Sequence, residues 1–278
     1  MSDAAQPSPG LPRGAGSATY RVMTTDDHEP FARDPVLARA AGYPYGITAA
    51  SFTLIGGEAR PFDAALTHGR TPVIGYGSNQ SPEQLRRKYG VNVSPIPVQR
   101  AWLDDHDVVY SAHFASYGSL PAALRHAPGT RVAVAVNWLD DAQLAVMHPT
   151  EQQNYHYARL NGIALHTAEG ETLDSACVYL GFRGHVARDG AAIALAEVTA
   201  ENRRLPSLGQ LAALALMRDH MAPGLTLAEF VRAHIDDAAL RADRVAALQA
   251  LSVAVAHAAH DVLGYDGAVA MAAAAAKP

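Results

Sequence analysis

The chain has 278 residues, of which 49% are hydrophobic, so it can bury a sizeable core in one large domain or two small ones. Its formal net charge of −5 leaves no excess of basic residues, which argues against nucleic acid as a partner. The single Cys177 excludes a disulfide within the chain, and we find neither an apolar run of membrane-spanning length nor a signal-peptide pattern. We therefore expect a cytoplasmic protein that binds neither nucleic acid nor a membrane.

The first part of the chain divides into a tail and an extension. Residues 1–18 are rich in Ala, Gly, Pro and Ser, a composition that predicts disorder. Residues 19–70 form an N-terminal extension of mixed pattern. Within it, residues 35–41 are a candidate short helix, and residues 47–55 are a candidate strand that leads into a glycine turn.

Residues 73–80, VIGYGSNQ, predict a short strand and a glycine-bearing turn, and SPEQ at 81–84 predicts a helix start. Ser81 is a good N-cap residue, and Gln84 completes a capping box. Such a turn directs backbone N–H groups at one spot beside the positive end of the helix dipole, which suits a carboxylate, a phosphate or a developing oxyanion. An ordinary tight connection between strand and helix is the alternative. The stretch contains no G-x-G-x-x-G motif, nucleophile elbow or P-loop lysine.

The segments that follow predict a sheet with short helices. A polar turn at 104–106 separates the first two strands, and Asp140 with Gln143 forms a second capping box before a helical turn or two. Several strands with only short helices between them predict a closed or strongly curved sheet in an α+β fold. The expected strands are 97–103, 107–112, 131–139, 155–165 and 172–180, and the expected helices are 81–88 and 140–147.

From Gly190 onward the chain is rich in Ala and Leu, and we expect three or four helices. Ser207 and Thr226 each precede a Gln or Glu at the spacing of a capping box, and residues 241–262 have an amphipathic pattern. We divide the chain into a barrel at 71–185 and a helical extension at 186–278. This extension packs on the barrel or forms a homodimer by pairing with a second copy.

Tyr76-Gly77-Ser78-Asn79, directly after a predicted strand, resembles the YGSN loop of the γ-glutamylcyclotransferase-like family. Further parts follow in the family's order. They are a strand–turn–strand at 101–110, Pro-Gly before the strand at 132–136, and the segment LAVMHPTE at 144–151 with two tyrosines behind it. The resemblance covers about residues 71–182 and implies a mixed β-barrel with short helices, to which the C-terminal helical extension is added.

The reaction that this resemblance implies is cleavage of a γ-glutamyl amide or amine to 5-oxoproline and a free amine, by an enzyme of the C–N lyase or acyltransferase type. The α-amino group of the substrate attacks its own γ-carbonyl, so no protein nucleophile is needed. One carboxylate whose pKa is raised by burial can serve as both base and acid. By its place in the resemblance, Glu151 is the candidate for that role. The candidate substrate-binding residues are Tyr76, Gly77, Ser78, Asn79, Tyr155 and Tyr157.

Two other functions remain open. One is a non-catalytic module that binds a small carboxylate or a partner protein, and the other is an acyl or amide transfer without cyclisation. A buried Glu151 aimed at residues 76–79 would favour the enzyme, whereas a separation of more than about 10 Å would favour the binding module. The 13 histidines include His257 and His260 at helical spacing, but no acidic or cysteine partner joins them in a motif, so we expect no metal and no other cofactor.

Overall fold

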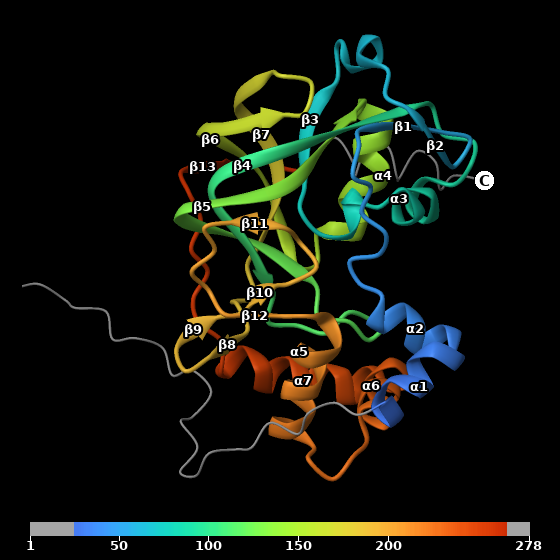
Figure 1. Cartoon of the computed structure of the whole chain (residues 1–278), viewed down its shortest axis with the longest axis vertical. Coiled ribbons are helices and arrows are strands. Elements are labelled where there is room, and N and C mark those ends of the chain that lie inside the picture. Colours follow the sequence, from blue (N-terminus) through green and yellow to red (C-terminus); the bar gives the residue numbers. More distant parts are fainter. Residues whose placement is uncertain (1–24, 266–278) are drawn as a thin grey trace, which may run out of the picture.

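The computed structural model describes residues 25–265, and a closed β-barrel forms its centre (Figure 1). The strands follow one another around the barrel in the order β5, β3, β7, β6 and β4, and β4 pairs with β5 to close the ring. The pairing of β3 with β7 is parallel and the others are antiparallel. Helices lie between and beside the strands, so the predicted α+β fold with a closed barrel is confirmed. The barrel strands are β3 (Thr71–Gly75), β4 (Ile96–Tyr110), β5 (Ala122–Leu139), β6 (Tyr155–Thr167) and β7 (Thr172–Gly181).

The centre of β5 is buried on both of its faces. Val132, Val134 and Val136 have no exposed surface, and the alanines between them are also buried. β-branched side chains at alternate positions suit a pleated strand, and burial of both faces explains why the run contains no charged residue between Arg131 and Leu139. This continuous apolar run is what made the strand recognisable in the sequence.

The expected break in β4 at residues 104–106 is wrong, because one strand continues through it. The register against β5 shifts between Asp104 and His106, which marks a β-bulge. Asp105 takes a left-handed conformation with φ +57°, and its carboxylate accepts the N–H of Gly129 at 2.7 Å. The long ladder on both sides of the bulge holds the strand together, so polar residues alone do not end it.

The N-terminal extension adds two helices and a hairpin to the barrel. The helix expected at residues 35–41 is confirmed, and a further helix precedes it. The strand expected from residue 47 begins only at Phe52, where it starts to pair with β4. The expected tail at residues 1–18 lies outside the described residues. These elements are α1 (Thr25–Arg33), α2 (Pro35–Ala41), β1 (Phe52–Ile55), β2 (Glu58–Pro61) and the 3₁₀ turn η1 (Ala64–Thr67).

The two predicted capping boxes in the barrel have different outcomes. Asp140 and Gln143 form the expected reciprocal bonds at the start of α4 (Asp141–Glu151). At the start of α3 (Pro82–Tyr89), the box of Ser81 and Gln84 does not form, and the Ser81 Oγ and Gln84 Oε1 atoms are buried without a partner. The backbone explains the difference, because the 3₁₀ turn η2 (Ser78–Gln80) precedes α3 and the Ser81 N–H closes it by donating to the Ser78 carbonyl.

The C-terminal part begins with short strands, and its helices start at Gln210 rather than near Gly190. Ser207 lies in a strand, while Thr226 forms the predicted capping box with Glu229. The helix expected over 241–262 ends at Ala250, because Val253 exchanges backbone hydrogen bonds with His185 and residues 260–262 pair with β6. These elements are β8 (Ala187–Arg188), β9 (Ala191–Ala192), β10 (Ala194–Leu195), β11 (Ala200–Glu201), β12 (Ser207–Leu208), α5 (Gln210–Met221), α6 (Leu227–Asp236), α7 (Ala238–Ala250) and β13 (His260–Val262).

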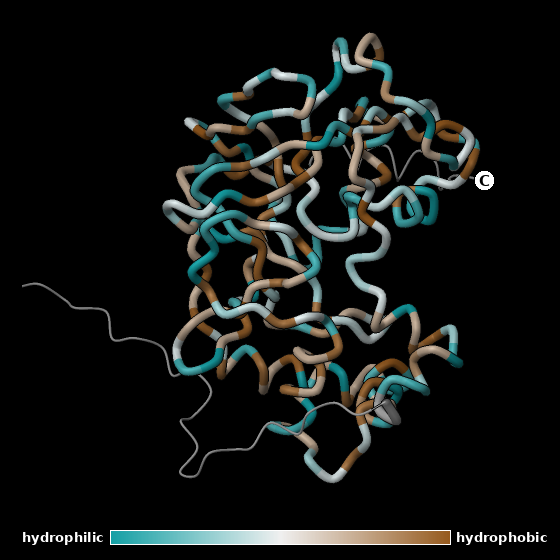
Figure 2. Tube along the Cα trace, viewed as in Figure 1, coloured by the Kyte–Doolittle hydropathy of each residue, from teal (hydrophilic) through white to brown (hydrophobic). Residues whose placement is uncertain are grey.

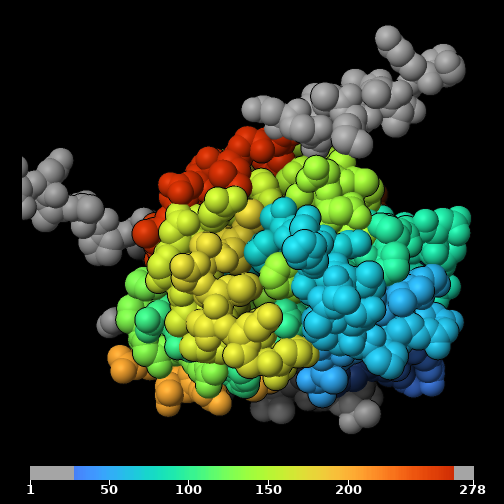
Figure 3. All heavy atoms as spheres, turned by 90° about the horizontal axis from the view of Figure 1, so that it is seen from above, coloured from blue at the N-terminus to red at the C-terminus, as the bar shows by residue number. Residues whose placement is uncertain are grey.

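Helices from the two ends of the chain gather at one end of the barrel. Figure 1 shows α1 and α2 beside α5, α6 and α7, and Figure 2 shows that these helices contain both hydrophobic and hydrophilic residues. The opposite end carries the β6–β7 hairpin next to the segment that contains η1 (Figure 3). Within residues 25–265, no helix is both long and apolar enough to cross a membrane.

The loop at residues 111–121, which joins β4 to β5, is fixed by both sets of helices. The Ser119 hydroxyl donates to the Ala40 carbonyl at 2.9 Å, and the His234 Nε2 lies 3.1 Å from the Gly118 carbonyl. Burial lowers the pKa of His234 to about 4, so the ring is neutral and its Nε2–H donates this bond. The ring of Phe114 packs on the same histidine, with the ring centres 4.6 Å apart. These contacts hold the loop rigidly against the helices.

Gly118 tests this attachment because only a residue without a side chain fits there. Its φ is +92°, and an added Cβ would lie 2.8 Å from Ile235 and 2.9 Å from Val231 on α6. We expect Gly118→Ala to lower the free energy of unfolding by about 2–4 kcal/mol, from the left-handed backbone together with overpacking. Gly170→Ala is the matched control, because Gly170 has φ +95° and no atom within 4 Å of the added Cβ. It should cost only about 1–2 kcal/mol. Urea denaturation measures both, and equal losses would contradict the packing account.

Candidate active site

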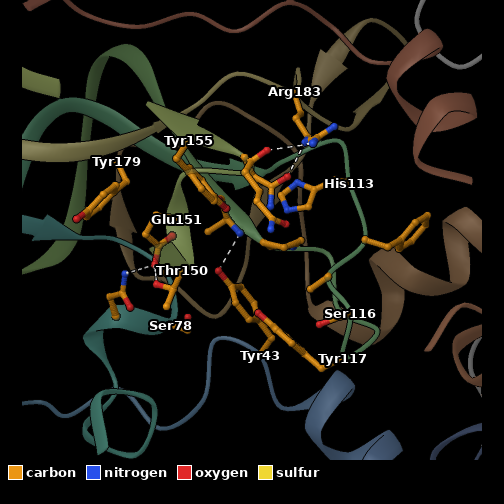
Figure 4. A pocket seen from close by; sticks show the side chains of 18 of the residues that line it. Tyr43, Ser78, His113, Ser116, Tyr117, Thr150, Glu151, Tyr155, Tyr179 and Arg183 are labelled. Atoms are coloured by element: carbon orange, nitrogen blue, oxygen red, sulfur yellow. Dashed lines mark hydrogen bonds between the residues drawn. The ribbon is translucent and has the colours of Figure 1, made fainter. Parts of the chain in front are cut away.

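A cavity of about 840 Å³ opens between the end of the barrel and the helices that gather there (Figure 4). Its floor is the turn after β3. One side is a face of α7, whose lining residues recur every three or four positions and therefore share that face. The lining comes from Arg39 and Tyr43, residues 74–79, 84, 87 and 88, residues 113–117, 121 and 122, residues 150, 151, 153–155, 179 and 183, and residues 238, 241, 242, 245, 246 and 249 of α7.

Glu151, the last residue of α4, lies directly beside the turn. Its Oε1 atom accepts hydrogen bonds from the Lys88 ammonium at 2.6 Å, the Asn79 amide at 3.2 Å and the Thr150 hydroxyl at 3.2 Å. Lys88 also donates to Asn79 Oδ1 at 2.9 Å, so the three side chains form one network. No group of residues 25–265 donates to the second oxygen, Oε2. Oε2 therefore accepts no hydrogen bond from these residues, and Oε1 holds the side chain in place beside the cavity.

The pKa of the Glu151 carboxyl lies below its ordinary value, which differs from the raised pKa that the sequence analysis expects. Burial raises this pKa, since the side chain is only 14% exposed. The charge of Lys88 and the hydrogen bonds from Lys88, Asn79 and Thr150 lower it by more than burial raises it. Lys88 is itself only 4% exposed, so the two charges face each other with little water between them. Glu151 is consequently ionised at neutral pH.

The two backbone N–H groups that follow the turn at residues 76–79 are used within the chain. The Gln80 N–H donates to the Gly77 carbonyl at 3.2 Å and the Ser81 N–H donates to the Ser78 carbonyl at 3.0 Å, so both are used inside the turn. Gly75 and Gly77 have no room for a side chain, because a Cβ at Gly75 would lie 2.7 Å from the Asn137 amide. The glycines therefore serve close packing of the turn. All four predicted residues of the turn line the cavity.

The three predicted tyrosines have different positions. The hydroxyls of Tyr76 and Tyr155 donate to the backbone carbonyls of Tyr179 and Ala122, so their protons are already used although both residues line the cavity. Tyr157 does not line it, and its ring packs against His148 with ring centres 4.6 Å apart. Tyr76 and Tyr155 thus shape the wall of the cavity with their rings, and Tyr157 supports the layer behind it.

Several residues that line the cavity are not predicted from the sequence. Lys88 belongs to the basic run at 86–88, but a basic run does not show which member turns inward. Tyr43, Arg39 and Arg241 come from the extensions, and only the folded chain brings them to the barrel. Their signal in the sequence is weak, because an isolated Tyr or Arg usually lies on the surface or packs its side chain.

The cavity carries an excess of positive charge. Among the described residues that line it, five are Arg or Lys and Glu151 is the one acidic residue. Burial lowers the pKa of His113 to about 3, so this lining histidine adds no charge at neutral pH. A cavity with this balance attracts an anionic ligand. The cationic residues are Arg39, Arg87, Lys88, Arg183 and Arg241.

We find no group of three or more His, Cys, Asp or Glu side chains within residues 25–265 that is placed to hold a metal ion. His257 and His260 do not share a helix, and the Nε2 of His257 lies 3.1 Å from the Gly181 carbonyl.

Comparisons with known proteins give no family assignment. No family model matches the sequence, and no curated protein matches it. Among solved structures, a γ-glutamyl cyclotransferase is 19% identical with a TM-score of 0.33, and the match covers 40% of this chain and 66% of that one. An uncharacterized protein from Homo sapiens is 15% identical with a TM-score of 0.34, and the match covers 59% of this chain and 86% of that one. The function proposed below therefore rests on the geometry of the site.

Lys88→Met tests what sets the charge of Glu151. Methionine keeps much of the buried stem but removes the ammonium, so the desolvation of Glu151 is no longer offset. We expect the pKa of Glu151 to rise from below 4.5 to above it. The measurement is the pH dependence of the ¹³C carboxyl shift of Glu151 by NMR. Arg87→Met is the control, because Arg87 pairs with the exposed Glu83 rather than with Glu151. A Glu151 pKa that stays low in Lys88→Met would show that hydrogen bonds alone set it.

Proposed function

We propose that the protein cleaves a γ-glutamyl amide or amine by intramolecular cyclisation, releasing 5-oxoproline and a free amine. The observation that supports this most directly is Glu151, which is nearly buried, fixed through Oε1 beside the turn at 76–79, and open at Oε2 toward a cavity. This is the arrangement that favours an enzyme over a binding module. The low similarity to a solved γ-glutamyl cyclotransferase agrees with the proposal but does not carry it.

The steps follow from the ionised state of Glu151. Its Oε2 binds the α-ammonium of the substrate and takes one proton, and the freed amine forms a bond to the γ-carbon while the carbonyl electrons move to oxygen. Glu151 gives this proton to the leaving nitrogen, and the carbonyl re-forms as the old C–N bond breaks. Glu151 then takes the second proton from the attacking nitrogen and passes it to the free amine. The attacking nitrogen thus loses two protons, and the amine departs as an ammonium that has gained two.

Lys88 has opposite effects on the two halves of this cycle. A low pKa makes Glu151 a weaker base toward the α-ammonium, but it makes the protonated form a stronger acid toward the leaving nitrogen. Expelling an amine from a tetrahedral intermediate requires that nitrogen to be protonated, so the ion pair suits the second half. Asn79 and Ser78 hold the γ-glutamyl part against the turn, and the rings of Tyr76 and Tyr155 enclose it.

One observation favours a second function, a module that binds a small amino-carboxylate without catalysis. The ion pair with Lys88 keeps Glu151 negative, and a permanent carboxylate among cations is a good receptor for a zwitterion. The same cavity would then bind the α-ammonium at Glu151 and carboxylates at the arginines. Formation of 5-oxoproline would favour the enzyme, and binding without product would favour the binding module.

We expect the wild type to form 5-oxoproline from at least one member of a panel of γ-glutamyl amino acids, peptides and amines, read by mass spectrometry. Glu151→Gln keeps the shape of the side chain but removes the base, so kcat/KM should fall about 100-fold or more. Glu58→Gln is the control, since Glu58 lies in an exposed pair with Arg60 on β2. Binding of the panel without turnover would favour the binding module instead.

The positive cavity predicts which leaving group is preferred. γ-Glutamylglycine and γ-glutamylmethylamine differ by one carboxylate on the leaving amine, and we expect kcat/KM to be at least about tenfold higher for the glycine compound. Arg39→Gln should narrow this ratio, while Arg60→Gln, outside the cavity, should leave it unchanged. Equal rates for both compounds would show that the arginines do not face the leaving group.

A further inference from the structure

Tyr43, from the segment that follows α2, reaches into the active-site cavity from outside the barrel. The residue is 4% exposed, and its ring packs edge-on against Tyr45 with ring centres 6.0 Å apart. Its hydroxyl lies against the turn, where a Cβ added to Gly77 would overlap it. The Ala122 N–H donates to the same hydroxyl at 2.8 Å (Figure 4). The side chain is thus fixed at both ends.

The hydrogen bonds of this phenol leave its proton free. The oxygen accepts the Ala122 N–H, and the Ser78 backbone also stabilises negative charge on it. Burial raises the pKa of Tyr43 nonetheless, so the hydroxyl keeps its proton. Among residues 25–265 we find no acceptor for that proton, whereas the hydroxyl protons of Tyr76 and Tyr155 are donated to backbone carbonyls. Because Tyr43 lines the cavity, its O–H is available to a ligand.

The Tyr43 hydroxyl lies against the turn at residues 76–79. The N–H groups of Gln80 and Ser81 donate within the chain, and the Ser78 backbone favours negative charge on the Tyr43 oxygen. A phenol that accepts backbone hydrogen bonds is polarised and becomes a better donor, since hydrogen bonds in a chain strengthen one another. The contribution of the turn can therefore reach a ligand through the Tyr43 hydroxyl.

We infer that Tyr43 donates a hydrogen bond to the γ-carbonyl oxygen of the substrate, and this inference rests on the proposed function. The bond strengthens as the α-amine attacks and negative charge develops on that oxygen, which is the condition for lowering the barrier. The phenol keeps its proton throughout. The N-terminal extension is then part of the catalytic machinery.

Tyr43→Phe removes the hydroxyl and keeps the ring. We expect kcat/KM for the best γ-glutamyl substrate to fall about 100-fold, mainly through kcat, because the donor acts most strongly in the transition state. Tyr45→Phe is the matched control, because Tyr45 lies in the same segment and does not line the cavity, and its activity should match the wild type. The melting temperature of both variants and their circular dichroism at the assay temperature show that the fold persists. A folded Tyr43→Phe with wild-type kcat/KM would overturn the inference and leave the proposed function standing.

Calorimetric binding of 5-oxo-L-proline distinguishes failure of the proposed reaction from failure of the proposed hydrogen bond from Tyr43. If the wild type forms no 5-oxoproline but binds this compound, and Tyr43→Phe binds it at least about tenfold more weakly, the proposed reaction fails and the hydrogen-bond donor stands. Equal binding by the two proteins, without turnover, overturns both. Absence of both turnover and binding in the wild type also overturns both.

Discussion

The ladder between β4 and β5 is the constraint on which the rest of the structure depends. It joins residues 98–110 to residues 122–137, and it closes the barrel that β3, β6 and β7 complete. Its two ends define the site. At one end lies the loop at 111–121, which lines the cavity, and at the other β5 runs into the capping box of α4, whose last residue is Glu151. Shifting the register of this ladder would therefore move both walls of the cavity together.

The pair of Glu151 and Lys88 is unusual because both charges are almost buried. Removing two charges from water costs several kcal/mol for each, and their attraction offsets that cost only with good geometry and further hydrogen bonds. The site meets both conditions at one atom, since Oε1 accepts three donors. A residue held in this way has a fixed direction, and Oε2 is the oxygen without a donor among residues 25–265. Such pairs are a poor source of stability, and their retention in a cavity is more readily explained by function.

Local patterns predicted the elements of the barrel, and long-range packing decided the rest. The valine run of β5 and the capping box at Asp140 depend on neighbours in the chain, so both were readable in the sequence. The box at Ser81 has the same local pattern but fails, because the preceding turn uses the Ser81 N–H and the side chain is buried. The end of α7 depends on His185, far away in the sequence.

The candidate site also contains residues that the sequence predicted and features that only long-range packing determines. The turn at 76–79 and Glu151 were identified through their order in the chain, and the structure brings Asn79 and Glu151 into contact. The direction of the Glu151 pKa shift was wrong, because it depends on Lys88, and a helix segment alone does not reveal which of three basic residues faces inward. Tyr43 contacts a residue 79 positions away, and no periodicity in the sequence indicates such a contact.

The helices that form one wall of the cavity come from the two ends of the chain, and they hold each other. Asp34, which caps α2, pairs with Arg232 on α6, and both α1 and α2 pack against α6. Glu151 and its hydrogen-bond partners belong to the barrel and its short helices, whereas Tyr43 and the cavity face of α7 belong to the segments at the two ends of the chain. Substitutions on the cavity face of α7 can therefore change what the cavity admits without disturbing the contacts of Lys88 and Asn79 with Glu151. In evolutionary terms, the α7 face of the cavity can drift while the network around Glu151 is kept.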